Sequence, residues 1–182
     1  MDHKWKDGLL WALIASTGVL FALATPTGLT ILGRMPQVMG VDLNRKPISI
    51  PASLTADRTL VLVSFQRGQG RDIDSWVQGM GLTENGSIAW VRMFVRSDPG
   101  DVGVRAAIEN RLQARYPSAQ ERSKVVPVFT DQEAFMKSVG LSATDQISAL
   151  ILNRNGEVLA RVEGPFDATK KIVIEDALKA PI

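Results

Sequence analysis

A continuous apolar run from residue 59 to residue 65, TLVLVSF, most constrains how this chain can fold. Leu and Val alternate through its centre without a polar residue, which is typical of a strand buried on both faces of a sheet. A helical pattern follows from about residue 71 to residue 80, and a second strand-like apolar run spans residues 88–95. This alternation predicts an α/β domain with helices packed on the faces of a sheet.

The alternation continues to the end of the chain. We expect extended pieces at 38–43 and 47–50, a helix at 102–116, a strand at 125–129, a helix at 130–139, hairpin strands at 148–152 and 157–162, and a last helix at 168–179. Asn155-Gly156 is a strong hairpin turn signal, and Pro127 favours an edge position for its strand. The expected sheet is mixed but largely parallel, with the hairpin as an antiparallel edge.

Three of the helical segments carry more detailed expectations. Thr130 and Glu133 have the spacing of a capping box, and Gly140 is placed to end that helix. The apolar positions of the helix at 102–116 are Val104, Ala107, Ile108 and Leu112, and those of the last helix are Ile172, Val173, Ala177 and Leu178.

An uncharged stretch from residue 9 to residue 32 precedes the domain. It is long enough to span ~30 Å of hydrocarbon at about 1.5 Å per residue. Lysines in front of it and the Ala22-x-Ala24 pattern also fit a signal peptide that is cleaved after Ala24. We expect residues 1–33 to be a retained transmembrane anchor, with residues 34–182 folded on the periplasmic side; export and cleavage is the alternative.

Two residue types that carry much catalytic chemistry are scarce. The chain contains no cysteine, and His3 is its only histidine. Disulfides, thiolate nucleophiles and zinc–thiolate sites are therefore excluded, as is a histidine-based triad in the folded domain. The formal net charge is only +2 and the basic residues are dispersed, which excludes nucleic acid as a partner. We expect no enzymatic activity, no cofactor and no metal.

The order of strands and helices resembles that of the thioredoxin-like superfamily. Residues 41–46, VDLNRK, are similar to the opening of periplasmic thioredoxin-like and peroxiredoxin-like proteins. Residues 150–158, LILNRNGEV, followed by Gly164, resemble the late hairpin of those proteins. The resemblance extends over residues 38–178 and implies a thioredoxin-like sandwich.

The sequence departs from that superfamily at both halves of its redox site. Redox members carry Cys-x-x-Cys, or one peroxidatic Cys, after the first core strand, where residues 66–71 here read QRGQGR. They also carry a cis-proline before the late hairpin, whereas residues 142–147 contain no proline. The resemblance therefore implies a fold that is reused for binding.

A shorter resemblance suggests the kind of partner. Residues 62–67, LVSFQR, together with residues 72–76, DIDSW, are similar to cysteine-free mitochondrial ATP synthase assembly factors. This likeness implies an accessory or assembly subunit of a membrane energy-transducing complex, whether respiratory, photosynthetic or ATP synthase. Its partners would be the membrane, through the N-terminal helix, and other subunits of the complex.

The candidate binding site consists of Arg67, Gly68, Gln69, Gly70 and Arg71. Free backbone N–H groups at a helix N-terminus attract anions, and two arginines add charge-assisted contacts. The alternative function is therefore a free periplasmic protein that binds an anionic ligand at this loop. The simpler interpretation is that the glycines only make a tight turn. Trp76 and Trp90 lie in apolar patterns and are expected in the core.

Overall fold

The computed structural model describes residues 30–84 and 86–181. Its strands are β1 (Gly33–Arg34), β2 (Val38–Val41), β3 (Pro47–Ile50), β4 (Arg58–Ser64), β5 (Ala89–Ser97), β6 (Val125–Thr130), β7 (Ser148–Asn153) and β8 (Glu157–Glu163). Its helices are the 3₁₀ turn η1 (Arg67–Gln69), α1 (Gly70–Gly79), α2 (Val102–Arg115), α3 (Ala119–Arg122), α4 (Gln132–Val139) and α5 (Ala168–Lys179). Most of these elements agree closely with the ranges expected from the sequence, whereas β1, η1 and α3 were not expected.

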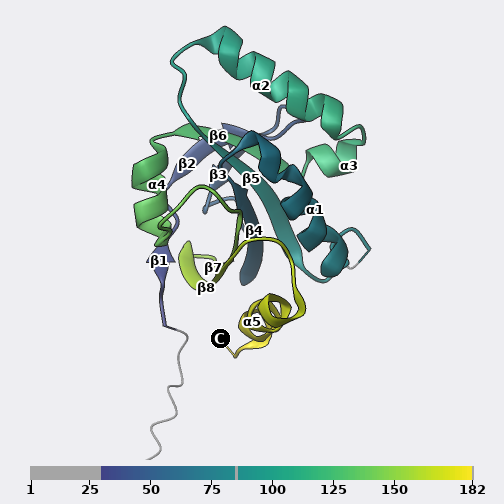
Figure 1. Cartoon of the computed structure of the whole chain (residues 1–182), viewed down its shortest axis with the longest axis vertical. Coiled ribbons are helices and arrows are strands. Elements are labelled where there is room, and N and C mark those ends of the chain that lie inside the picture. The colour runs from purple at the N-terminus through teal and green to yellow at the C-terminus, as the bar shows by residue number, and fades with distance from the viewer. Residues whose placement is uncertain (1–29, 85, 182) are drawn as a thin grey trace, which may run out of the picture.

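The main sheet has the strand order β1-β8-β7-β4-β5-β6, and β2 and β3 form a separate antiparallel hairpin (Figure 1). The mixed α/β architecture is confirmed, and so is the edge position of β6, which contains Pro127. The prediction of a largely parallel sheet is wrong. Only the β4–β5 and β5–β6 pairings are parallel, while β7, β8 and β1 add antiparallel pairings on the other side of β4.

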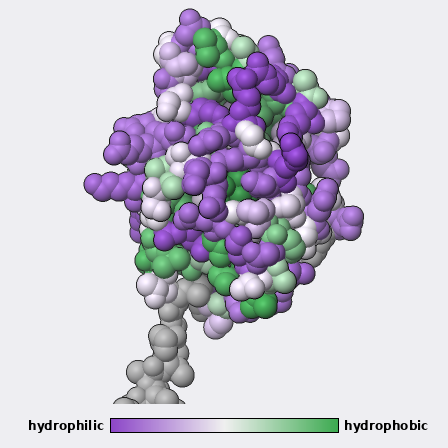
Figure 2. All heavy atoms as spheres, in the orientation of Figure 1, coloured by the Kyte–Doolittle hydropathy of each residue, from purple (hydrophilic) through white to green (hydrophobic). Residues whose placement is uncertain are grey.

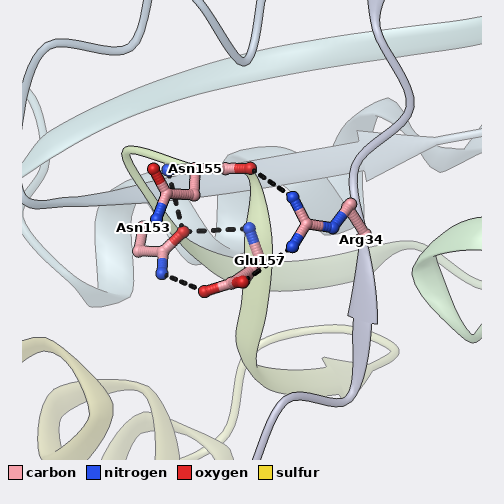
Figure 3. Close-up of polar contacts among 4 residues, drawn as sticks. All are labelled: Arg34, Asn153, Asn155 and Glu157. Atoms are coloured by element: carbon pink, nitrogen blue, oxygen red, sulfur yellow. Dashed lines mark hydrogen bonds and ion pairs between the residues drawn. The ribbon is translucent and has the colours of Figure 1, made fainter.

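The antiparallel edge of the sheet is β1 and not the hairpin. Gly33 pairs with Val158 of β8. The Arg34 guanidinium donates to the backbone oxygen of Asn155 and lies 2.7 Å from a carboxylate oxygen of Glu157 (Figure 3). The start of the domain is thus attached to the turn of the late hairpin, a pairing that local sequence does not reveal.

Residues 1–29 of the expected membrane or signal segment lie outside the part of the chain that the structure describes. Within the part that is described, no helix is both long and apolar enough to cross a bilayer. The backbone N–H of Leu32 already donates to the Val158 oxygen. Leu32 and Gly33, which the sequence assigned to the anchor segment, therefore already pair with β8 at the edge of the sheet.

Strand β4 is buried on both faces, as its composition predicted. Leu60 and Leu62 pack into a cluster with residues of α1 and α5. Val61 and Val63 point to the opposite face, into a cluster with residues of α4 and the β2–β3 hairpin. All four side chains are fully buried, and each contributes about 1.5–3 kcal/mol relative to an exposed position. The sheet is therefore sandwiched between two apolar layers.

Helix α4 begins one residue later than expected. Asp131, and not Thr130, is its N-cap, and the Asp131 side chain accepts from the Ala134 N–H at 3.0 Å. Thr130 is unavailable because it is the last residue of β6, in register with Ser97. The predicted end of the helix is confirmed, since Gly140 is the left-handed C-cap.

Helix α5 buries its apolar positions only partly as expected, since Ala177 and Leu178 pack against a core cluster whereas Ile172 and Val173 do not. Ile174 and Ala177 are its buried residues, whereas Ile172 and Val173 are exposed. Asp167 fixes the start of the helix by accepting from the Lys170 N–H at 2.9 Å. How the helix is rotated about its axis against β7 and β8 decides which side chains are buried. The apolar residues of α5 are spread around the helix, so the sequence pattern alone does not specify that rotation.

Helix α2 stands at the edge of the molecule and buries none of its residues (Figure 1). Its Val102 and Val104 are 78% and 47% exposed. Leu112 alone among the expected apolar positions packs against a core cluster, the one that contains Phe94 and Tyr116. The apolar positions of this helix are therefore largely left without partners inside the described chain.

The hairpin turn offers a test of the fold. Gly156 has a φ of +76°, and an added Cβ would lie 2.6 Å from Cγ of Pro51. We expect Gly156→Ala to lower the free energy of unfolding by about 2–4 kcal/mol, from left-handed strain and the clash together. Gly81→Ala is the control, because its φ is +60° but nothing lies within 4 Å of the added atom. Urea unfolding should show the smaller loss for Gly81→Ala; equal losses would contradict the packing at Pro51.

Candidate functional site

The candidate loop lies beyond the carboxyl end of β4, where ligands bind in open α/β sheets. The chain leaves β4 after Ser64, makes the 3₁₀ turn at residues 67–69 and enters α1 at Gly70. Cysteines of redox-active thioredoxin-like proteins occupy the corresponding loop. Arg67, Gly68 and Arg71 are exposed here, whereas Gln69 and Gly70 are buried.

Gln69 holds this loop closed. Its side chain is 5% exposed, and its Oε1 accepts from the backbone N–H groups of Phe65 and Gln66 at 2.7 and 3.0 Å. Its Nε2 donates to the backbone oxygen of Thr144 at 2.7 Å. Gln69 therefore joins the two segments that carry the cysteines and the cis-proline in redox members. Its polar atoms are engaged within the protein.

Gly70 lies directly beneath the guanidinium of Arg115. A Cβ at Gly70 would lie 2.7 Å from Nη1 of Arg115, whereas one at Gly68 would meet nothing within 4 Å. The two glycines of the loop thus differ. Gly70 makes room for a side chain from the end of α2, and Gly68 leaves the loop surface open.

Three arginines make this edge of the molecule positive. Neither Arg67 nor Arg71 forms an ion pair within the described part of the chain. Arg96, at the end of β5, donates to the backbone oxygens of Ser64 and Val95 at 3.1 and 2.9 Å. Burial lowers the pKa of Arg96, and the charge of Arg67 lowers it further. Sequence reasoning missed Arg96, whose only signal was a charge at the end of an apolar run.

The two tryptophans of the domain belong to the core, as expected. Trp76 is fully buried and Trp90 nearly so. The indole N–H of Trp76 donates to the Gly164 oxygen, and that of Trp90 donates to the Leu82 oxygen, both at 3.0 Å. Among the described residues, no three carboxylate or histidine side chains come together in a way that could hold a metal ion.

The fold is shared with solved structures of thioredoxin-like proteins. A putative electron transport protein from Aquifex aeolicus is 12% identical and matches with a TM-score of 0.58 over 84% of this chain and 100% of its own. BsSco, a member of the Sco family of cytochrome c oxidase assembly proteins, is 14% identical, with a TM-score of 0.53 over 81% of this chain and 93% of its own. The exposed lipoprotein thioredoxin Etrx1 from Streptococcus pneumoniae is also 14% identical, with a TM-score of 0.50 over 79% and 98% of the two chains.

No family model matches the sequence, and no curated protein matches it. The structural likenesses nonetheless define the class: the chain has a thioredoxin-like fold. Because the chain contains no cysteine, it cannot carry out thiol–disulfide exchange.

Proposed function

We propose that this chain is a non-catalytic thioredoxin-like accessory or assembly subunit that acts by binding other proteins of a membrane energy-transducing complex. The loss of every cysteine removes the chemistry for which redox members use the fold. Gln69 adds to this, because its three hydrogen bonds fill the former redox site with a structural contact.

The observation that carries the proposal is the exposure of α2. A helix that buries none of its residues gains little stability from its own domain, because most helical stability in proteins comes from packing. Figure 2 shows hydrophobic residues at the surface of the upper part of the molecule, where α2 lies. Val102 and Val104 of α2 are both exposed, and apolar side chains exposed on an otherwise unpacked helix are available for protein binding.

The proposed partners are subunits of a respiratory, photosynthetic or ATP synthase complex, and the proposed place is the periplasmic face of the membrane. The uncharged stretch at residues 9–32 supports an anchor. A protein of the same fold is described as a cytochrome c oxidase assembly protein, which supports the choice of complex. The short likeness of residues 62–67 and 72–76 to ATP synthase assembly factors supports it independently.

Photo-crosslinking of the full-length chain in native membranes tests this function. We expect a photoreactive amino acid at Val104 to form covalent adducts with a subunit of such a complex, identified by mass spectrometry. Ala52, exposed in the turn after β3, is the matched control position and should give few adducts. A second variant, Val104→Asp, should reduce co-purification about tenfold, since a charge is poorly tolerated at an apolar contact.

Two outcomes would reject the proposal. One is isolation of the chain alone from membranes solubilised in mild detergent. The other is equal crosslinking from Val104 and Ala52.

The alternative function, a free periplasmic protein that binds an anion at residues 67–71, is favoured by one observation. Arg96 adds a third positive charge beside Arg67. A mature N-terminus at Thr25 together with saturable phosphate binding, lost in Arg67→Ala, would support this function instead.

A further inference from the structure

A concave site lies away from the candidate loop, between β5, α3 and the connection that follows α1. Its volume is about 320 Å³, at the lower end of the range for pockets that bind small molecules. We call it the Trp90 pocket. Its wall combines apolar side chains with charged ones: Leu82, Ile88, Trp90, Arg92, Glu121 and Lys124.

Arg92 is the unusual residue of this pocket. It is only 4% exposed, although it lies on a strand of the core sheet. Its Nε and Nη1 atoms are buried and have no hydrogen-bond partner among the described residues. Its guanidinium carbon lies 4.9 Å from the ring centroids of both Trp90 and Tyr116. The aromatic faces hold the cation in place, but they accept no conventional hydrogen bond from it.

The carboxylates nearby do not fully neutralise this charge. Oδ1 of Asp74 lies 3.9 Å from Nη2 of Arg92, but Oδ2 of the same carboxylate is bound to Arg115 at 2.6 Å. Glu121 is held mainly by the Ser118 hydroxyl, a contact that lowers the pKa of Glu121 and keeps it ionised. Each carboxylate near the guanidinium is thus shared with another partner.

Lys124 adds a second cation beside the Trp90 ring. Its Nζ lies 5.9 Å from the centroid of the Trp90 ring. Arg92, Arg115 and Lys124 therefore face Asp74 and Glu121, so this cluster carries one excess positive charge. A buried cation with unused donors favours an anion in the adjoining space, since an uncompensated charge at low dielectric is costly.

We infer that the Trp90 pocket binds a small monocarboxylic acid with a planar apolar body. The carboxylate accepts a charge-assisted hydrogen bond from Lys124 and lies toward the buried positive charge of Arg92. The apolar body packs on Trp90, with Leu82 and Ile88 beside it, as aromatic groups do on an indole face. A single negative charge suits the single excess positive charge, whereas a phosphate dianion would also meet repulsion from Glu121.

This inference does not rest on the proposed function. The Trp90 pocket involves β5, α3 and the α1–β5 connection, whereas the proposed docking surface is on α2. A failure of one experiment therefore leaves the other proposal standing.

Calorimetric titration of the full-length protein with phenylacetate tests the site, with phenylacetamide as the neutral ligand of the same shape. We expect phenylacetate to bind with a Kd of about 1 mM or better and the amide to bind about tenfold or more weakly. Arg92→Met keeps an unbranched, though shorter, side chain and removes its charge, so it should weaken phenylacetate binding about tenfold or more. Arg154→Met, which changes an exposed arginine in the β7–β8 turn outside the pocket, should leave binding unchanged.

A second variant keeps the test decisive if Arg92→Met fails to fold. Lys124→Met leaves the buried cation in place and should weaken phenylacetate binding about three- to tenfold. The proposal is overturned if phenylacetate does not bind the wild-type protein, if the amide binds equally well, or if neither variant in the pocket changes the affinity.

Discussion

Replacing Trp76 by alanine is expected to lower the free energy of unfolding by about 3–5 kcal/mol, the range for truncating a large buried aromatic side chain. Trp76 is fully buried at the centre of the layer formed by α1 and α5. Its ring meets Phe166 edge to face at a centroid distance of 5.3 Å. Its indole N–H also donates to the Gly164 oxygen at 3.0 Å.

These contacts explain why the loss should be large. Gly164 and Phe166 lie in the connection between β8 and α5, so Trp76 joins α1 to a segment far away in the sequence. Truncation leaves a cavity in a close-packed layer and a carbonyl without its donor at the same time. Neighbouring backbone cannot collapse easily into the space, because strands β4 and β7 are fixed by their pairing.

Urea unfolding followed by circular dichroism measures this effect. Trp76→Phe is the matched variant, since it keeps an aromatic ring and removes the N–H donor. We expect it to cost less than the alanine variant, about 1–3 kcal/mol. A loss below about 1.5 kcal/mol for Trp76→Ala would show that this residue does not organise the layer.

Gln69→Ala is expected to lower the free energy of unfolding by about 2–4 kcal/mol, because three backbone groups lose their hydrogen-bond partner together. The Phe65 N–H is buried and has Oε1 of Gln69 as its acceptor at 2.7 Å. The Thr144 oxygen would lose the Nε2 donor that connects it to the loop. A small side chain can restore neither contact.

Gln66→Ala is the control, since Gln66 is an exposed neighbour in the same loop. It should change the free energy of unfolding by less than about 0.5 kcal/mol, as is usual for a surface substitution. Hydrogen exchange provides a local readout: the Phe65 amide should exchange faster in Gln69→Ala and not in Gln66→Ala. Equal stability of the two variants would show that the loop closes without Gln69.

The Gln69 contact also explains how the fold can do without its cysteines. The β4–α1 loop and the segment before β7 meet at this edge, and each has backbone groups that need partners. One amide side chain satisfies groups of both segments, because it offers an acceptor and a donor from the same position. The sequence shows that thiol chemistry is impossible for this chain, and the structure shows which contact holds this edge together.

Much of the fold could be read from local pattern. The two buried faces of β4 follow from its uninterrupted apolar run, and the late hairpin follows from Asn155-Gly156. Gly140 ends α4 as expected, and Pro127 lies on an edge strand. Each of these features depends on a few neighbouring residues, whose backbone preferences are already set in the sequence.

For the candidate loop, local sequence patterns predicted the position but not the roles of the individual residues. Its position followed from the strand and helix on either side, together with the resemblance to redox members. The separate roles of its residues did not, because Gln69 and Arg71 differ in burial and only tertiary contacts bury one of them. Arg92 could not be recognised as a candidate binding residue, since in the sequence it is only one charge within an apolar run. Its contacts with the Trp90 and Tyr116 rings exist only in the folded chain.

The sequence by itself determined the α/β class, the order of the elements and the impossibility of thiol chemistry, because composition and short-range periodicity specify these. Tertiary structure alone decided that β1 closes the sheet against β8 and that α5 buries Ile174. It also decided that α2 packs on almost nothing and that a buried arginine borders a pocket. These outcomes depend on which distant surfaces meet, and that is settled by the packing of the whole chain.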